Sequence, residues 1–319
     1  PDPLAGYTLW AGASGVWLKE NRARHIVNSH GMLDREVVLK TDAFRVAVFG
    51  DSKTEALQVD RALTFVGQAQ SALSTNDRSV DVLNFGLAGA TPAVMAARLE
   101  GLAAKFAPDL IVVLVSIGDF SSPFMGNDSK FAGYVSNGGV ITRGVAFRDT
   151  AAYQFRTSRL GKITYSLISS MRVLSVLNSR KNVGLFTELT SAVPVTINAA
   201  LEQDRQIATA VTYKKLWVDH EPRESWSRTS AFFADLDQQR RHLNAKMVVG
   251  FMGMNSLGGA FRDQLIAKLN KAFHPIRIVD FEKHVSWHLS DNTLMTHLSG
   301  FKGDVGQGHL NTLGHGMYG

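Results

Sequence analysis

Short apolar runs and amphipathic stretches alternate along the chain from Arg45 onward. Runs of roughly 4–8 apolar residues are typical of buried strands, and apolar residues at helical spacing are typical of helices that cover a sheet. The predicted strands are 45–49, 80–85, 110–117, 246–252 and 276–281, and the predicted helices are 55–73, 92–106 and 260–273. This alternation predicts an α/β fold with a mostly parallel sheet and helices on both faces.

Two segments lie outside this alternation. Residues 1–40 contain aromatic residues and glycine-rich turns without a long helical period, which predicts a small strand-rich lead-in. Residues 121–241 are too many for a simple crossover between neighbouring strands. We interpret this second segment as a helical insertion or cap within an α/β domain that spans 41–319.

The insertion combines an apolar helical face with an excess of basic residues. The apolar face consists of Ile163, Leu167, Met171, Leu174 and Leu177. Between 140 and 181 one acid, Asp149, stands among the basic residues Arg143, Arg148, Arg156, Arg159, Lys162, Arg172, Arg180 and Lys181. Two interpretations stay open: a face that packs on the parent domain, and a surface that meets an anionic membrane or polymer. No nucleic-acid motif accompanies these charges, so a nucleic-acid partner is not expected.

Composition narrows the chemistry. The chain has 319 residues, of which 45% are hydrophobic, and this is enough for one large α/β domain with an insertion or for two modest domains. It contains no cysteine, which excludes disulfides, thiolate catalysis and cysteine-based zinc sites. No apolar stretch approaches the roughly 20 residues that a membrane-spanning helix needs.

Ser52 is the strongest candidate for a nucleophile. It follows the strand 45–49 within the sequence Gly50-Asp51-Ser52 and precedes the first predicted helix. This position is at the carboxyl end of the sheet, where open α/β folds bind their ligands. At such a turn the amides of a helix N-terminus point toward developing negative charge.

His309 is the best candidate for the base that a serine nucleophile needs at neutral pH. It follows the last predicted strand, so its loop can return to the crevice that holds Ser52. The alternative role for this histidine is a structural hydrogen bond.

Three sequence blocks resemble those of the SGNH/GDSL hydrolase family, in the family's order. They are 49–55 (FGDSKTE), 84–89 (NFGLAG) and 309–311 (HLN) with Gly314. The upstream residues 28–31 (NSHG), with Arg35 and Glu36, also resemble a lead-in of bacterial members. The resemblance covers 45–117 and 246–319, and the central insertion has no counterpart in it.

This resemblance implies a flavodoxin-like, three-layer α/β/α fold with a helical insertion. It implies Ser52 as nucleophile and His309 as base. The N–H groups of Ser52 and Gly89 would hold the oxyanion, with Asp51 expected beside the oxyanion and substrate. It implies no cofactor. An extracytoplasmic location, periplasmic or secreted, is expected, and a membrane tether through a removed segment stays an open alternative.

Two positions depart from the family's pattern. The third block usually has Asn before Asp, whereas this chain has Gly118 before Asp119, so a side-chain amide donor to the oxyanion is missing. The fifth block usually has Asp three residues before the histidine, where this chain has Gly306. Asp304 is the acid predicted to reach the imidazole of His309. If Asp304 does not reach the imidazole, the site works as a Ser-His dyad, uses another acid or is inactive.

A metal site is the weaker competing interpretation. His284 and His288 are spaced to share a helix face, but no third ligand stands out beyond Glu282, and no metal is expected. The glycine-rich stretch 253–259 lacks the Lys-Ser/Thr signature of a phosphate-binding loop.

The sequence therefore supports two hypotheses of different classes. The first is an exported bacterial serine esterase or O-acyltransferase that removes or moves a short acyl (acetyl) group on a carbohydrate, the substrate class being implied by the resemblance alone. Its partner would be an acylated carbohydrate or another small ester. The second is a catalytically degenerate binding or assembly module for polysaccharide that keeps the fold and the crevice.

Overall fold

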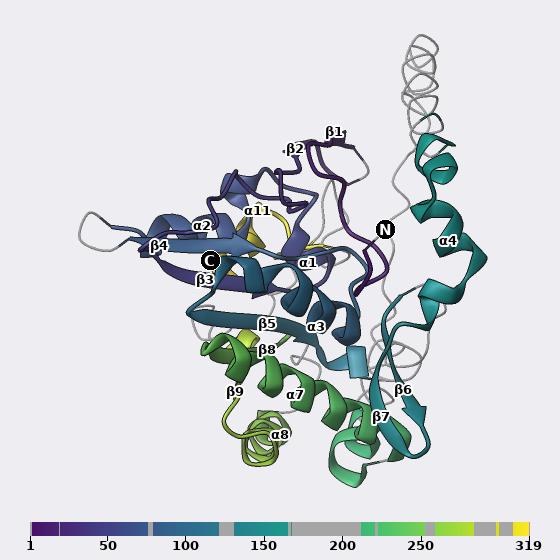
Figure 1. Ribbon diagram of the computed structural model, residues 1–319. Helices are drawn as coiled ribbons and strands as arrows, with labels where there is room; N and C mark the ends of the chain where they lie inside the picture. Colours follow the sequence, from purple (N-terminus) through teal and green to yellow (C-terminus); the bar gives the residue numbers. More distant parts are fainter. Residues whose placement is uncertain are drawn as a thin grey trace, which may run out of the picture.

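The computed structural model describes residues 2–18, 20–75, 79–120, 131–164, 167, 212–220, 223–252, 259–283, 298–299 and 309–318 (Figure 1). Its centre is a five-stranded sheet in which all neighbouring strands are parallel. The strand order is β4-β3-β5-β8-β9, with β3 Phe44–Phe49, β4 Val80–Asn84, β5 Leu110–Ser116, β8 Lys246–Met252 and β9 Arg277–Asp280. All five predicted strands are present, and the predicted mostly parallel sheet is confirmed.

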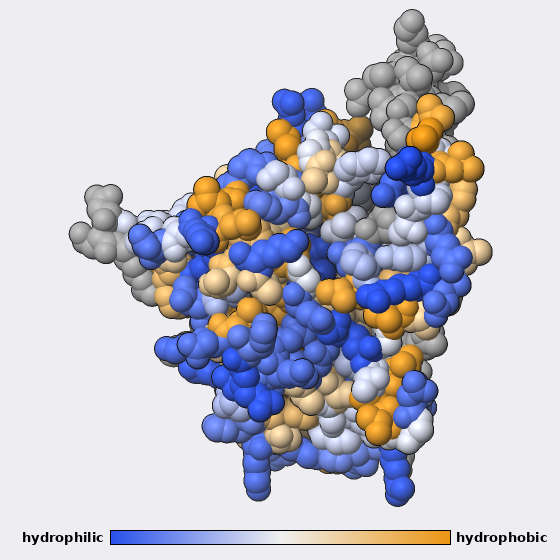
Figure 2. Space-filling view, viewed as in Figure 1, coloured by the Kyte–Doolittle hydropathy of each residue, from blue (hydrophilic) through white to orange (hydrophobic). Residues whose placement is uncertain are grey.

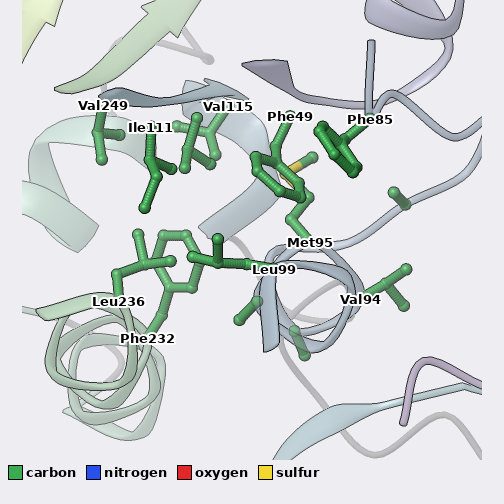
Figure 3. Close-up of a cluster of buried hydrophobic side chains, with 14 of the residues drawn as sticks. Phe49, Phe85, Val94, Met95, Leu99, Ile111, Val115, Phe232, Leu236 and Val249 are labelled. Atoms are coloured by element: carbon green, nitrogen blue, oxygen red, sulfur yellow. The ribbon is translucent and has the colours of Figure 1, made fainter. Parts of the chain in front are cut away.

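Helices cover both faces of this sheet, which confirms the predicted three-layer α/β/α arrangement. On one face, α3 (Pro92–Gly101), α7 (Arg223–Leu243) and α8 (Gly259–Ala272) pack against the larger core, which contains Phe49, Ile111 and Val249 (Figure 3). On the other face, α2 (Phe65–Leu73) and α11 (Thr312–Tyr318) cover a smaller core around Val46, Val82 and Leu114. The strands are buried on both faces, which is why they read as continuous apolar runs.

The predicted helix 55–73 is wrong as a single element. The structure divides this stretch into α1 (Ser52–Glu55), a 3₁₀ turn (Arg61–Leu63) and α2. Ala56 closes α1 with a left-handed φ of 59°, and Thr64 caps α2 by accepting a hydrogen bond from the N–H of Gly67 at 3.0 Å. Local caps therefore override a helical spacing of apolar residues.

The structure also differs at the end of the predicted insertion. Helix α7 begins at Arg223, inside the stretch 121–241, and its Phe232, Phe233 and Leu236 are buried in the larger core (Figure 3). These side chains make α7 one of the helices that cover the sheet. The earlier described part of the insertion forms an antiparallel hairpin of β6 (Gly133–Asn137) and β7 (Val140–Gly144), followed by α4 (Ala151–Thr157).

The lead-in contains a short antiparallel hairpin of β1 (Ser14–Trp17) and β2 (Ala23–Ile26). It lies near α1 and α11, at the end of the sheet where the strands finish (Figure 1). Within the described ranges, no helix combines the length and the apolar character needed to cross a membrane.

Candidate active site

Ser52 is presented by a tight turn at the end of β3. Asp51 precedes α1 and caps it, since its carboxylate accepts a hydrogen bond from the N–H of Lys53 at 2.9 Å. A Cβ at Gly50 would lie 2.0 Å from Oγ1 of Thr54, so only glycine allows the chain to turn this sharply against α1. Ser52 thus becomes the first residue of α1, at the carboxyl end of the sheet.

The structure brings His309 to Ser52, although the two residues are 257 positions apart in the chain. Nε2 of His309 lies 2.9 Å from Oγ of Ser52. The backbone after His309 is fixed by a hydrogen bond from the N–H of Asn311 to the carbonyl of Leu298, and α11 follows directly. These contacts hold the imidazole over the carboxyl end of β3.

The acid that faces His309 is Glu20, which lies in the loop between β1 and β2. Its Oε1 is 2.8 Å from Nδ1 of His309, on the opposite side of the ring from Ser52. A carboxylate can only accept, so it favours the tautomer with a proton on Nδ1. The unprotonated Nε2 then accepts the hydroxyl proton of Ser52. The predicted acid, Asp304, lies outside the described residues, as does Gly306.

Glu20 is held in place by the stretch that follows α1. Its Oε2 accepts a hydrogen bond from Nε2 of Gln58 at 2.9 Å. The hairpin is tied to the same stretch by hydrogen bonds from Asn21 to the carbonyl of Gln58 (3.0 Å) and between His25 and the carbonyl of Leu57 (2.8 Å). These bonds fix the position of an acid that no motif or spacing in the sequence indicated.

The turn after β4 supplies a second candidate oxyanion donor, Gly89, which has a positive φ of 74°. In this turn the N–H of Leu87 bonds the carbonyl of Gly50 (3.1 Å), and the N–H of Ala90 bonds that of Leu87 (2.9 Å). The N–H of Ala88 bonds Oε2 of Glu55 (2.9 Å). Among the described residues, the amides of Ser52 and Gly89 have no hydrogen-bond partner, so both are available to a ligand.

Close packing keeps this turn against α1. A Cβ on Gly86 would lie 2.3 Å from the backbone nitrogen of Glu55. Buried Asn84 donates to the carbonyl of Thr54 at 2.9 Å and accepts from the N–H of Gly86 at 2.9 Å. Asn84, which belongs to the second sequence block, therefore fixes the turn that carries Gly89.

Glu55 is a buried carboxyl group within the same turn. Burial raises its pKa to about 7, against the opposing effects of the Ala88 N–H, Arg98 and His309. Arg98 is also buried and bonds the carbonyl of Phe85 (3.3 Å) and the hydroxyl of Thr8 (3.1 Å). Glu55 therefore contacts the turn that carries Gly89 directly, and buried Arg98 contacts Phe85 at the start of that turn.

Gly118 has no side chain that could donate to an oxyanion, but the hydroxyl group of another residue lies beside it. Oη of Tyr213 is 3.3 Å from the position that a Cβ on Gly118 would take. Neighbouring Asp119 accepts a hydrogen bond from the N–H of Ser116 at 2.8 Å, and burial raises its pKa to about 7. Burial and the nearby Asp119 also raise the pKa of Tyr213, so its phenol stays protonated at neutral pH.

The second histidine of the C-terminal block, His315, has a structural position. It is buried, its ring stacks on Phe65 with centroids 5.7 Å apart, and its Nδ1 accepts a hydrogen bond from the N–H of Phe65 at 3.2 Å. Burial lowers its pKa to about 4, so the ring is neutral at physiological pH. His315 thereby ties α11 to α2.

The basic residues of the segment 140–181 that the structure describes fall into two groups, those with hydrogen-bond or ion-pair partners and those that are exposed. Arg143 pairs with Asp235 and Glu100, and Arg148 donates to the carbonyl of Pro3. Arg156, Arg159 and Lys162 are exposed beside the exposed apolar residues Leu160, Ile163 and Leu167. Apolar surface is visible on the helical segment next to α4 (Figure 2). The remaining residues predicted for this surface, Met171, Arg172, Leu174, Leu177, Arg180 and Lys181, lie outside the described residues.

The two histidines of the competing metal interpretation, His284 and His288, also lie outside the described residues. In the part of the chain that the structure describes, no group of three His, Asp or Glu side chains is arranged to hold a metal ion.

Comparisons with known proteins give matches only among solved structures. No protein-family model matches the chain, and no curated protein matches it. A structure of TesA shares 14% identity (86% of this chain, 93% of that one, TM-score 0.39). LAE5, an alpha/beta hydrolase from the metagenome of Lake Arreo, shares 12% (88% and 93%, TM-score 0.41). A mutant of Axe2, an acetylxylan esterase from Geobacillus stearothermophilus, shares 10% (88% and 92%, TM-score 0.39). The function therefore has to be inferred from the site itself.

Proposed function

We propose that this protein is a serine-dependent esterase or O-acyltransferase in which Ser52, His309 and Glu20 form the catalytic triad. The observation that carries this proposal is one continuous chain of two hydrogen bonds. It runs from Oγ of Ser52 to Nε2 of His309 (2.9 Å) and from Nδ1 of His309 to Oε1 of Glu20 (2.8 Å). Nucleophile, base and orienting acid in this sequence are the recurring arrangement of acyl transfer by serine.

The reaction begins with proton transfer from Ser52 to His309. As Oγ attacks the ester carbonyl, Nε2 takes the hydroxyl proton, and the carboxylate of Glu20 stabilises the imidazolium that forms. The carbonyl oxygen becomes an oxyanion, which the unpaired N–H groups of Ser52 and Gly89 hold by hydrogen bonds. His309 then returns the proton to the leaving alcohol oxygen, and an acyl-serine remains.

The second half of the reaction releases the acyl group. His309 takes a proton from water or from a sugar hydroxyl, and the oxygen of that acceptor attacks the acyl-serine. The tetrahedral intermediate again places its oxyanion at Ser52 and Gly89, and Ser52 recovers its proton from His309. Water as acceptor gives an esterase, and a sugar hydroxyl gives an acyltransferase.

We propose a short acyl group, such as acetyl, on a carbohydrate as the substrate. This substrate class and the extracytoplasmic location follow from the family resemblance of the three sequence blocks. The rival function is a polysaccharide-binding module without catalysis. The intact hydrogen-bond chain favours the enzyme, because a binding module has no need to keep an acid, a base and a hydroxyl in this order.

A fluorophosphonate probe tests the proposal, because it modifies only an activated serine. We expect labelling of the wild type, loss of labelling in Ser52→Ala, and full labelling in the matched control Ser71→Ala, whose hydroxyl bonds the carbonyl of Gly67 on α2. Hydrolysis of an aryl acetate should fall by roughly 10⁵- to 10⁶-fold in Ser52→Ala. An added sugar acceptor then separates transfer from hydrolysis. An unlabelled wild type would favour the binding module.

A further inference from the structure

We infer that Tyr7 of the lead-in is a positioning residue that aims the N–H of Gly89 at the oxyanion. The inference rests on the proposed function, since the direction of this N–H matters only if an acyl transfer takes place. Among the described residues, Tyr7 forms no hydrogen bond with Ser52 or with His309. Its role is to fix the peptide unit that carries the donor.

The contact that carries the inference joins Tyr7 to that peptide unit. Oη of Tyr7 donates a hydrogen bond to the carbonyl of Ala88 at 2.9 Å. This carbonyl and the N–H of Gly89 belong to the same peptide, and in a trans peptide the two groups point in opposite directions. Holding the carbonyl oxygen on one side therefore fixes the direction of the N–H on the other.

The turn needs such a restraint because Gly89 has a positive φ of 74°. Glycine adopts positive and negative φ with similar ease, so this peptide could otherwise rotate. On the preceding peptide, Oε2 of Glu55 accepts the N–H of Ala88 at 2.9 Å. Tyr7 and Glu55 thus hold the two peptide units on either side of the Ala88 Cα, and the N–H of Gly89 is left for a ligand.

The chemistry of Tyr7 suits this role. Burial raises the pKa of its phenol above the usual range, so the hydroxyl remains a donor at every pH at which the enzyme would work. Its ring packs against Phe131 with centroids 4.7 Å apart, which fixes the side chain independently of the hydroxyl. Removing only the hydroxyl should therefore release the peptide without releasing the ring.

Steady-state kinetics of Tyr7→Phe test the inference. We expect kcat to fall roughly 10- to 100-fold with KM nearly unchanged, because removing an oxyanion donor outright costs about 10²–10³ in kcat and misdirecting one costs less. The matched control is Tyr153→Phe. The hydroxyl of Tyr153 also donates to a lead-in carbonyl, that of Asp2 at 3.3 Å, but away from the Gly89 turn, and its removal should leave kcat unchanged.

A second readout separates positioning from a general loss of structure. A trifluoromethyl ketone forms a tetrahedral serine adduct with an oxyanion, so its inhibition constant should rise in Tyr7→Phe by the same factor as kcat falls. Replacement of Tyr7 by 4-aminophenylalanine keeps a donor at the same ring position and should restore kcat. The Tm of each variant reports folding separately.

The outcomes distinguish this inference from the proposed function. An unlabelled, inactive wild type overturns the proposed function and the inference with it. An active wild type with kcat in Tyr7→Phe within twofold overturns the inference alone. A rise in KM without a fall in kcat, or a loss of kcat that 4-aminophenylalanine does not restore, also overturns it.

Discussion

The lead-in and the described part of the insertion both lie outside the parallel sheet, but they contact it in different ways. Two polar side chains of the lead-in reach the carboxyl end of the sheet: Glu20 bonds His309, and Tyr7 bonds the carbonyl of Ala88. The described part of the insertion contributes buried aromatic side chains to the larger core, as at Tyr134 and Trp217. The role of each segment therefore depends on which side chains it brings to the sheet, and the length of the segment does not reveal this role.

The insertion's contacts are those of a core. Trp217 is fully buried and packs against Phe120 and Phe251, with ring centroids 5.1 Å and 5.6 Å apart. The hydroxyl of Tyr134 bonds Asp235 on α7 at 2.9 Å, and Nε of Arg143 bonds the same carboxylate at 2.7 Å. We therefore expect changes at Glu20 to alter catalysis and changes at the contact of Tyr134 with Asp235 to alter stability.

The largest effect is expected from Glu20→Gln. An amide can donate to Nδ1 of His309 and so favour the wrong tautomer, and in a serine protease the equivalent change costs about 10⁴ in kcat. We expect kcat to fall by roughly 10³- to 10⁴-fold with little change in Tm. The matched control is Glu36→Gln, since Glu36 bonds Ser29 within the lead-in and should leave kcat unchanged. Equal losses in both variants would contradict the assignment of Glu20.

The next largest effect is expected from Asp235→Ala, on stability. This change leaves the partly buried guanidinium of Arg143 and the hydroxyl of buried Tyr134 without their carboxylate. Removing one partner of a buried ion pair costs about 3–5 kcal/mol. Guanidinium chloride unfolding should show this loss, while kcat of the folded fraction stays near the wild-type value. A matching fall in kcat would mean that the two regions are not separate in function.

A smaller effect is expected in the pH dependence of stability. Burial raises the pKa of Glu55, which faces the lead-in, from 4.5 to about 7, and that of Asp119, beside Tyr213, from 3.8 to about 7. Between about pH 4 and pH 7 the folded chain keeps these protons while the unfolded chain loses them. The free energy of unfolding should therefore fall as the pH rises, by about 3 kcal/mol for Glu55 and about 4 kcal/mol for Asp119.

Two variants divide this pH dependence between the regions. Glu55→Gln and Asp119→Asn should each flatten the fall in unfolding free energy between pH 4 and pH 7, as measured by denaturant unfolding at several pH values. If only one of the two variants flattens the dependence of unfolding free energy on pH, the titrating group lies in the region of that variant alone. An unaltered profile in both would contradict the buried carboxyl groups as its source.

The smallest effect concerns the exposed basic residues next to α4, which we propose contact an anionic surface. Each Lys or Arg near an anionic bilayer contributes about 1 kcal/mol. Vesicles with phosphatidylserine should bind the wild type at low salt, and Arg159→Glu with Lys162→Glu should weaken binding. The control with an equal change of net charge is Lys40→Glu with Lys271→Glu, at exposed positions in the lead-in and on α8. Binding that does not weaken with salt would contradict an electrostatic contact.

Much of the fold could be predicted because the strands are buried on both faces. Apart from Ser116 and Lys246 at their ends, Leu110–Ser116 and Lys246–Met252 are apolar runs, and such runs are typical of buried strands. The helix 55–73 was predicted wrongly because spacing alone does not show where Ala56 ends one helix and Thr64 starts another. Caps depend on single residues, to which a periodicity is insensitive.

The candidate site was predictable in part for a similar reason. Ser52 and His309 each sit in a motif beside a strand or helix, and the structure brings them within hydrogen-bonding distance. Glu20 has no motif, and it reaches Nδ1 of His309 across 289 positions of the chain. Only the tertiary contacts of the β1–β2 hairpin with the stretch after α1 bring it there. The sequence predicted Asp304, which lies outside the described residues, and left open that another acid takes this role, but nothing in it indicated Glu20.

The separation of Glu20 from His309 also has a consequence for biosynthesis. Domains form as the polypeptide leaves the ribosome, beginning at the N-terminus, at about 5–20 residues per second. His309 is translated 257 positions after Ser52, and α11, which supports it, follows directly. A growing polypeptide therefore carries Ser52 without its proposed base until His309 has been made, so the proposed acyl transfer cannot start on a shorter product.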